Sequence, residues 1–313
     1  GEVAELVQEL PYFGLRLLPP SLTKSGEEFK LEGRDLRYGL KSIKGISEKS
    51  IAHLQSFINQ DKTNLFQVFQ AADQSKVNVT VLSALVECGC LEDVSPFDRQ
   101  KTVLFLKIWK ELSVKEKSYC LENGDKFNFD LILMLKGYLT WVGSNGKPLG
   151  KESRLETIRK NCAPAIQIWK ENSKNPMISQ YLFEKKLLGY CPSTTLSELF
   201  KEYPNLSKIT QIKTDLYENE RLNVVAEIKE FKTGVAKKSQ QKYCKLELSD
   251  ETGSMTCLFT GDNWANYLRV FGEPEEGQII YVIGSKGKGE DPVIFGQKGE
   301  PQNLKIFQRD RKS

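Results

Sequence analysis

The chain has 313 residues, of which 39% are hydrophobic and 27% are charged, and its formal net charge is +4. This composition excludes a disordered chain, and the length is enough for two or three domains. No apolar run approaches the ~20 residues that a membrane-spanning helix needs. The acidic start from Gly1 to Glu5 does not resemble a signal peptide, so we expect a cytoplasmic location.

Seven cysteines are scattered along the chain without any C-x-x-C pair, and the single histidine does not lie near enough to them to help bind zinc. We therefore expect reduced thiols and no metal site, and we expect His53 to have a packing or surface role. No paired carboxylates with the character of a catalytic metal site occur either, so we assign no catalytic residue. The cysteines are Cys88, Cys90, Cys120, Cys162, Cys191, Cys244 and Cys257.

The first hundred residues predict mostly helices. Helical spacing covers residues 3–14, and an extended piece at 15–20 and a short strand at 29–31 follow. Residues 38–58 predict two short helices joined by a hairpin with Gly45 at its tip. Amphipathic helices are expected at 65–72 and 79–88. The turn at 88–91 is similar to a second hairpin, but it carries no lysine, so we assign it a packing role.

The hairpin around Gly45 has the chemistry of a phosphate site. Gly45 can adopt the positive φ of a tight reversal, and Ser47 can cap the second helix through its hydroxyl. Backbone N–H groups at a helix start attract anions. The residues alone leave a solvated turn between helices as an equal alternative. The candidate contacts to duplex DNA are Lys41, Ser42, Lys44, Gly45, Ser47 and Lys49.

The middle of the chain predicts further helices. Residues 98–112 and 127–141 are strongly apolar and predict two buried helices, and 143–150 reads as a loop. A basic helix is expected at 151–174, and another at 179–188 that ends at Gly189.

From about residue 209 the pattern becomes alternating, which predicts strands. Five strands with a helix between the third and the fourth match the order of a small Greek-key barrel of the OB type. The sequence therefore predicts a multidomain α+β protein, with a helical region followed by a five-stranded OB-type barrel. The strands are expected at 222–231, 243–248, 254–259, 277–284 and 293–297, and the helix at 262–271.

Barrels of this type bind single-stranded nucleic acid across the second and third strands and the flanking loops. Residues 232–242 hold four lysines and no acid, which predicts a mobile cationic loop for a phosphate backbone. Two aromatic residues are candidates for base stacking, with a buried core position as the alternative for Phe259. The candidate residues are Lys232, Lys237, Lys238, Lys242, Tyr243, Phe259, Lys286 and Lys288.

Five segments, in order, resemble the C-terminal part of the bacterial DNA polymerase III alpha subunit, a C-family replicative polymerase. They are Gly14–Pro20 with Ser25 and Phe29, similar to G-I-x-V-x-P-P…S…F; Leu36–Ile46, similar to the I-R-F-G-L-x-A-I-K-G-V-G helix-hairpin-helix; Val81–Glu92; Phe183–Tyr190, similar to E-K-E-L-L-G-F-Y; and Leu246–Leu258 in the barrel. Ser47 stands where the family has a second hairpin glycine, and residues 96–176 match poorly.

The resemblance implies a division into residues 1–34 as the end of a fingers-like segment, 35–95 as a helix-hairpin-helix region that binds duplex DNA, 96–208 as a helical middle and linker, and 209–313 as an OB-fold domain with a C-terminal tail. It implies that the palm domain, with its catalytic aspartates and Mg²⁺, lies upstream of these segments. We therefore expect no cofactor in this chain and no activity on its own, in a bacterial or phage-infected cell.

The partners implied are a primed template, in both its duplex and its single-stranded parts, and a catalytic polymerase portion. A sliding clamp is a further candidate partner, because Gln180–Phe183 and Gln302–Phe307 are similar to the clamp peptide Q-x-x-L-F. An alternative function is an interaction module whose helical middle docks a clamp, a clamp loader or the catalytic subunit.

Overall fold

A computed structural model describes residues 2–308, and its internal contacts divide them into two units. The helical unit runs from Tyr12 to Gly189 and includes the segment from Ile306; the barrel unit combines the residues up to Pro11 with Tyr190–Lys305. The four-part division expected from the sequence stays a prediction. Within residues 2–308, no helix combines the length and the apolar character needed to cross a membrane.

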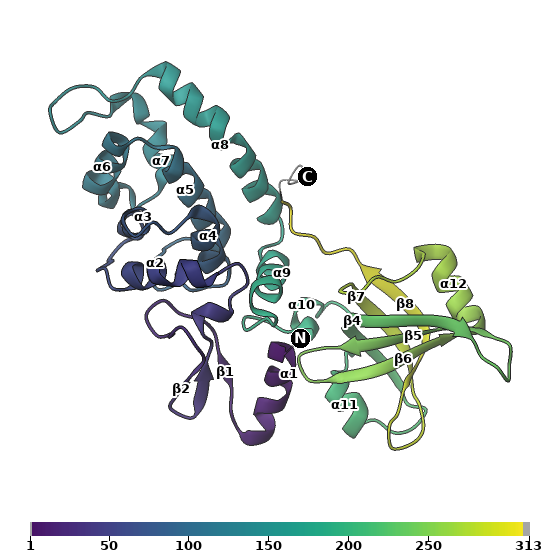
Figure 1. Cartoon of the computed structure of the whole chain (residues 1–313). Coiled ribbons are helices and arrows are strands. Elements are labelled where there is room, and N and C mark those ends of the chain that lie inside the picture. The colour runs from purple at the N-terminus through teal and green to yellow at the C-terminus, as the bar shows by residue number, and fades with distance from the viewer. Residues whose placement is uncertain (1, 309–313) are drawn as a thin grey trace. The chain divides into compact units, whose positions relative to one another are not determined.

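The helical unit is built on a small three-stranded sheet and a bundle of helices (Figure 1). Side chains cap several helices: Asn78, Asp98 and Ser113 each accept a backbone N–H in the first turn. Its elements are the second half of η1 (Leu10–Phe13), β1 (Leu17–Leu18), β2 (Lys30–Glu32), β3 (Asp35–Arg37), η2 (Leu40–Ser42), α2 (Glu48–Ile58), α3 (Leu65–Gln74), α4 (Val79–Glu87), α5 (Arg99–Glu111), α6 (Val114–Asn123), η3 (Gly124–Phe127), α7 (Leu131–Lys136), η4 (Tyr138–Thr140), α8 (Glu152–Asn172) and α9 (Pro176–Leu188).

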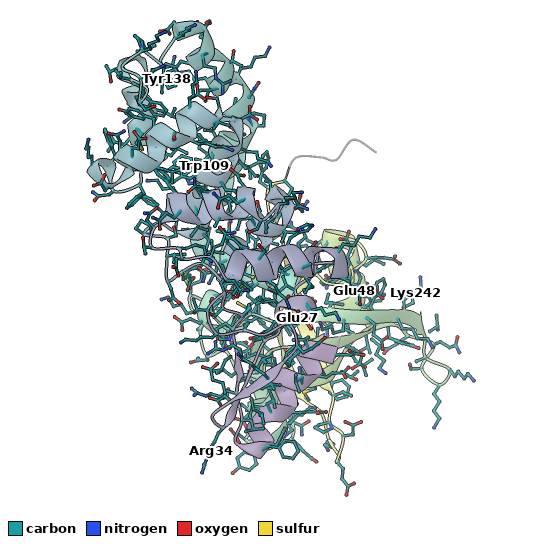
Figure 2. All side chains as sticks on the ribbon, turned by 60° about the vertical axis from the view of Figure 1, so that its left-hand side comes forward. Glu27, Arg34, Glu48, Trp109, Tyr138 and Lys242 are labelled. Carbon is teal, nitrogen blue, oxygen red and sulfur yellow. The ribbon has the colours of Figure 1, made fainter. Side chains whose placement is uncertain are left out.

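Aromatic side chains fill the core of this unit. Trp109 of α5 is 1% exposed and stacks on Phe66 of α3, with ring centroids 5.6 Å apart. Tyr138 is fully buried, and Figure 2 shows it and Trp109 inside the stacked helices.

The turn at 88–91 has the packing role expected of it: Gly89 has φ +90°, and a Cβ there would lie 2.6 Å from the guanidinium of Arg99. That guanidinium forms an ion pair with the buried Glu184.

Three expectations for this unit were wrong. The first helix of the hairpin is only a 3₁₀ turn, η2. The single helix expected at 127–141 is broken into η3, α7 and η4, because Asn128 and Phe129 both have a positive φ, which an α-helix cannot accommodate. Ser47 is the N-cap of α2, but its hydroxyl accepts no backbone N–H and lies 3.1 Å from Ser50 Oγ instead.

The barrel unit confirms the predicted strands and their order. The strands close in the sequence β4-β5-β6-β8-β7, and β7 pairs back with β4; β6 and β8 are parallel, and the other pairs are antiparallel. This order, with α12 between the third and fourth strands, is an OB-type barrel. The elements are α1 (Glu2–Glu9), α10 (Leu196–Leu199), α11 (Ile209–Thr214), β4 (Arg221–Val235), β5 (Lys242–Ser249), β6 (Ser254–Thr260), α12 (Gly261–Phe271), β7 (Ile279–Lys286) and β8 (Ile294–Gln302).

Alternate residues of the strands point into the barrel. On β6, for example, Met255, Cys257 and Phe259 are at most 3% exposed, whereas the residues between them are polar or half-buried. Helix α1 belongs to this unit because Gln8 Nε2 donates to Ser249 Oγ at 3.2 Å and to the Asp250 carbonyl at 3.0 Å. The interior of the barrel is therefore a packed core, and any ligand must bind on its outer surface.

Candidate nucleic-acid interface

Hydrogen bonds and close backbone packing fix the buried side of the hairpin in the helical unit. Tyr38 is 1% exposed, and its hydroxyl lies 3.0 Å from the carbonyl oxygens of both Ser42 and Leu188. Burial raises the pKa of Tyr38, so the hydroxyl stays protonated as a donor. Gly39 passes so close to the backbone of residues 27–29 that a Cβ would lie 2.4 Å from the Glu28 carbonyl carbon. Glycine is therefore required at this position.

The tip of the hairpin has the predicted backbone shape. Gly45 has φ +94°, is exposed, and has open space where a Cβ would lie. The N–H of Lys44 already donates to the Leu187 carbonyl at 2.9 Å, so it cannot also bind a phosphate. The first turn of α2 begins directly after the tip, which directs the positive end of the helix dipole outward. The geometry thus leaves the tip and the start of α2 as the anion-facing part.

The charges around the tip are mixed. Lys41 Nζ lies 3.4 Å from Glu28 and 3.7 Å from Glu48, and the hydrogen bond to Glu28 followed by the attraction of both carboxylates raises the pKa of Lys41. Figure 2 labels Glu48 and Glu27 beside this part of the chain. Lys44 and Lys49 are exposed, and within residues 2–308 neither forms an ion pair with an acidic side chain. Ser42 is exposed at the end of η2.

The lysine-rich segment of the barrel unit is not a loop, as the sequence had led us to expect, but the extended end of a β-hairpin. Strand β4 continues to Val235 and pairs with β5 up to Lys242, so Lys232 lies opposite Lys245 and the turn is confined to residues 236–241. In the turn, the Ala236 N–H donates to the Gln241 carbonyl at 2.9 Å. This hairpin projects from the barrel in Figure 1, and Lys242, labelled in Figure 2, lies where the turn meets β5. We call residues 232–242 the basic hairpin.

A row of side chains continues from the basic hairpin across the outside of the barrel. In the register of the strands, Lys232 lies opposite Lys245, Lys245 opposite Leu258, and Leu258 opposite Phe295. Phe295 is 46% exposed, which is high for a phenylalanine in a strand. Tyr243 lies beside this row with its ring against Gly234, where a Cβ would be 2.7 Å from its hydroxyl. We call Tyr243, Lys245, Leu258 and Phe295 the outer face.

Two predicted site residues are not on this surface. Phe259 is 1% exposed in the barrel core, where its ring fills the space left by Gly296 and Gly299, so it cannot stack on a base. Lys286 is 8% exposed, and its Nζ donates to the carbonyl oxygens of Lys213 and Leu216 at 2.9 and 2.7 Å. It satisfies carbonyl groups at the end of α11 instead of facing a groove. Lys288 is exposed, as expected.

The sequence reasoning missed Phe295 and Lys245. Strand β8 was expected, and Ile294 and Gly296 are its inward residues, so strict alternation already places Phe295 outside. The same rule places Phe259 inside with Cys257 and Met255. The alternation of each strand was therefore the signal that distinguishes the two phenylalanines.

The two peptides that are similar to a clamp motif lie in different settings. Gln180–Phe183 is part of α9, and Tyr181 and Phe183 are 4% and 5% exposed, so this stretch is not an accessible extended peptide. In the other, Phe307 is held by Asn172: its N–H donates to Asn172 Oδ1 at 2.8 Å, and its carbonyl accepts from Nδ2 at 3.1 Å. Among residues 2–308 no cluster of three potential metal ligands is found.

Comparison with known proteins adds to this geometry. The family model described as helix-hairpin-helix motif matches residues 14–102. The DNA polymerase III subunit alpha of Bacillus subtilis is 22% identical over 93% of this chain, and that of Chlamydia trachomatis is 24% identical over 90%. This chain resembles the helix-hairpin-helix and OB-fold portion of the DNA polymerase III alpha subunit.

The resemblance covers only part of those proteins. The chain spans 23% of the length of the Bacillus relative and 21% of the Chlamydia relative. The alpha subunit of Aquifex aeolicus is 33% identical over 28% of this chain. Among solved structures, a domain of replication protein A from Methanococcus maripaludis is 22% identical, covers 30% of this chain and 92% of its own, and has a TM-score of 0.23. The OB assignment rests on the strand order and not on that score.

Proposed function

We propose that this chain is the DNA-binding portion of a C-family replicative polymerase in a bacterial or phage-infected cell, and that it binds DNA without sequence specificity. The barrel unit binds the single-stranded template through the basic hairpin and the outer face. The hairpin at Gly45 binds the backbone of the duplex. A catalytic portion with its own Mg²⁺ supplies the chemistry.

The observation that carries this proposal is the outer face. Exposed aromatic rings beside lysines are what non-specific single-strand binding uses, because every base has a face to stack and every nucleotide a phosphate. The exposed Phe295 and the half-buried Tyr243 supply the rings; Lys232, Lys245 and Leu258 form one register row with Phe295, and Tyr243 lies two residues before Lys245 on β5. The basic hairpin adds Lys237, Lys238 and Lys242 and holds no acid.

Salt titration of binding tests the proposal. The intact chain is mixed with a fluorescent oligo-dT strand, and anisotropy gives the affinity at several NaCl concentrations. Removing three lysines in the variant Lys237→Ala/Lys238→Ala/Lys242→Ala should lower the slope of log K against log salt by about 2, at ~0.7 per phosphate contact on a single strand.

The matched control is Lys151→Ala/Lys160→Ala/Lys170→Ala, which removes the same charge from exposed positions on the helical unit. It should leave the slope close to that of the unchanged chain. Equal slopes for both triple variants would contradict binding by the basic hairpin, and an affinity independent of salt would contradict the proposal as a whole.

A further inference from the structure

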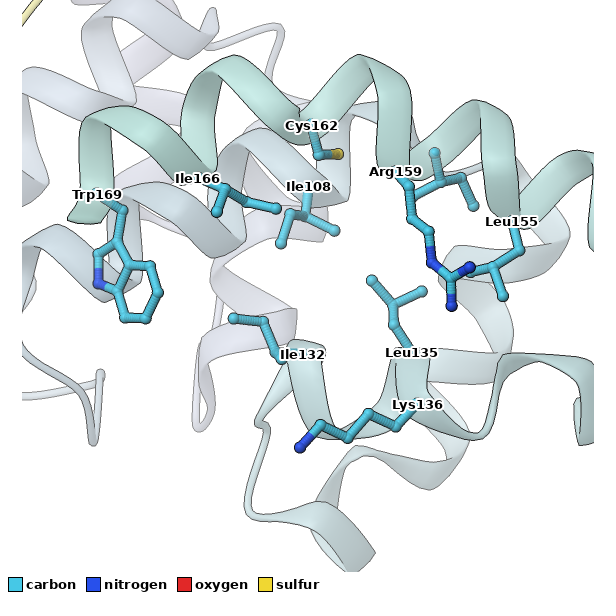
Figure 3. A pocket seen from close by; sticks show the side chains of 10 residues that line it. Ile108, Ile132, Leu135, Lys136, Leu155, Arg159, Cys162, Ile166 and Trp169 are labelled. Carbon is cyan, nitrogen blue, oxygen red and sulfur yellow. The ribbon is translucent and has the colours of Figure 1, made fainter. Parts of the chain in front are cut away.

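An apolar groove lies on the helical unit between α5, α7 and α8. Its floor is Ile108 of α5, one wall is Ile132 and Leu135 of α7, and the other wall is α8 with Leu155 and Ile166 (Figure 3). Trp169 of α8 closes one end. The volume is about 320 Å³, at the lower end of the range for binding pockets.

The groove exists because the apolar stripe of α8 is longer than the surface that covers it. Leu155, Ile158 and Cys162 are at most 6% exposed and pack on the unit, but Ile166 and Trp169 continue the same stripe and are only half-buried. α7 is six residues long, from Leu131 to Lys136, so it leaves that part of α8 uncovered. Two helices and a floor with an open front are the geometry into which a third helix packs.

The rim of the groove is cationic. Arg159 of α8 and Lys136 of α7 are both exposed and line it, and no acidic residue lines it. Within residues 2–308, neither is assigned an ion pair, although Lys101 and Arg154 of the same unit have theirs. An occupant that buries apolar side chains here is favoured if it also brings carboxylates to these two positions.

We propose that this groove binds an amphipathic helix of a partner protein, with leucine-like anchors on one face and acidic residues beside them. Helix-in-groove recognition uses anchors spaced like those of a helix face, and the apolar walls match it. A second copy of this chain fits less well, because a two-fold contact would bring Arg159 and Lys136 against their own counterparts. A DNA strand fits less well, because its phosphates would lie against aliphatic walls. The proposal does not depend on DNA binding by the barrel.

The experiment uses the intact chain and a fluorescein-labelled peptide of about 18 residues, five helical turns, with Leu at helical spacing and Glu elsewhere. A second peptide has Lys in place of Glu, and a third has the first peptide's composition in scrambled order. Anisotropy gives each affinity. The acidic amphipathic peptide should bind more tightly than both others.

Charge reversal makes the test specific. In Lys136→Glu/Arg159→Glu the acidic peptide should bind at least about tenfold more weakly, ~1.4 kcal/mol, and the basic peptide more tightly. The control Lys110→Glu/Lys160→Glu changes the charge equally at exposed positions of α5 and α8 that do not line the groove. It should leave both affinities unchanged. Trp169→Ala removes the end wall without changing the charge of the protein, and it should weaken binding of the acidic peptide.

Several results would overturn the proposal. These are equal binding of the acidic and scrambled peptides, or no effect of charge reversal. A dimer in sedimentation that Trp169→Ala dissociates would assign the groove to a second copy. Loss of oligo-dT binding in Lys136→Glu/Arg159→Glu but not in its control would assign it to phosphate. Because the oligo-dT titration of the basic hairpin uses other residues, failure of one proposal is distinguishable from failure of the other.

Discussion

At the scale of single residues, the three lysines of the hairpin have different surroundings. Lys41 forms ion pairs with Glu28 and Glu48, whereas Lys44 and Lys49 are exposed. We predict that Lys44→Ala and Lys49→Ala each lower the salt slope of duplex binding by about 0.9, the value of one phosphate contact. Lys41→Ala should change it less, because its charge is already compensated.

The measurement is anisotropy of a fluorescent duplex at several NaCl concentrations. A larger effect of Lys41→Ala than of the other two would show that a phosphate replaces the carboxylates in the complex. Gly45→Ala serves as a backbone variant and Gly146→Ala as its control, since both glycines have positive φ and open space for a Cβ. Both should lose similar stability, and only Gly45→Ala should weaken duplex binding.

Glu116 is a buried carboxylate in the helical core. It is 4% exposed and accepts from Tyr138 Oη at 2.6 Å, from Arg154 Nε at 3.1 Å and from the Ser113 N–H at 2.6 Å. Burial opposes its charge, but these hydrogen bonds and the attraction of Arg154 outweigh burial and lower the pKa of Glu116.

We predict that Glu116→Gln lowers the free energy of unfolding by about 1.5–3 kcal/mol at neutral pH, the usual contribution of hydrogen bonds to a charged group. A carboxyl whose pKa is lowered on folding stabilises the fold above its ordinary pKa, and this is lost as the pH falls through the lowered value. Urea unfolding between neutral pH and about pH 3 should therefore show a flatter curve for Glu116→Gln. The control Glu122→Gln, exposed on the same helix, should follow the unchanged chain.

At the scale of elements, the strands of the barrel were predictable and their site residues only partly so. Alternation located all five strands, because one face of each strand packs on the core. The sequence makes Phe259 a candidate for base stacking with a core position as the alternative, and its neighbours Cys257 and Met255 mark its side of β6 as inward. The burial of Lys286 was not predictable, since it depends on the carbonyl groups of Lys213 in α11 and of Leu216 just after it, 73 and 70 residues away in the chain.

We predict opposite effects on DNA binding and on stability when Phe295 and Phe259 are replaced. Phe295→Ala should weaken oligo-dT binding by ~1–3 kcal/mol, as for a stacked base, and change stability little because the ring is exposed. Phe259→Ala should cost about 3–5 kcal/mol of folding free energy, because it leaves a cavity in the barrel core. Thermal unfolding and anisotropy on each variant measure the two effects. Strong DNA loss in a folded Phe259→Ala protein would contradict this assignment.

The hairpin was predictable as a turn because Gly45 and its lysines are local features. The division into units was not, because the residues up to Pro11 join the barrel through Gln8 and Ser249, which are 241 residues apart. The groove beside α8 could likewise not be predicted from the sequence. The spacing of Ile166 and Trp169 continues a buried stripe, and only the length of α7 shows that they are left half-covered.

The seven thiols give a test of the fold across both units. None forms a disulfide; six are buried, and Cys191 is half-buried. Burial raises the pKa of Cys120 to about 12 and of Cys162 and Cys244 to about 11, and it also raises those of Cys90 and Cys257. Because the thiolate is the reactive form, these groups are protected both by access and by protonation.

We therefore predict that a disulfide reagent such as Ellman's labels Cys191 rapidly in the folded chain and the other six thiols only at the rate of unfolding. The labelled fraction should rise to all seven in denaturant. Cys191→Ser should abolish the rapid phase and leave the slow one unchanged, whereas Cys162→Ser, in the α8 wall of the groove, should leave the rapid phase intact. Rapid reaction of a second thiol would mean that one of the two units opens readily, and the variant lacking that thiol would show which.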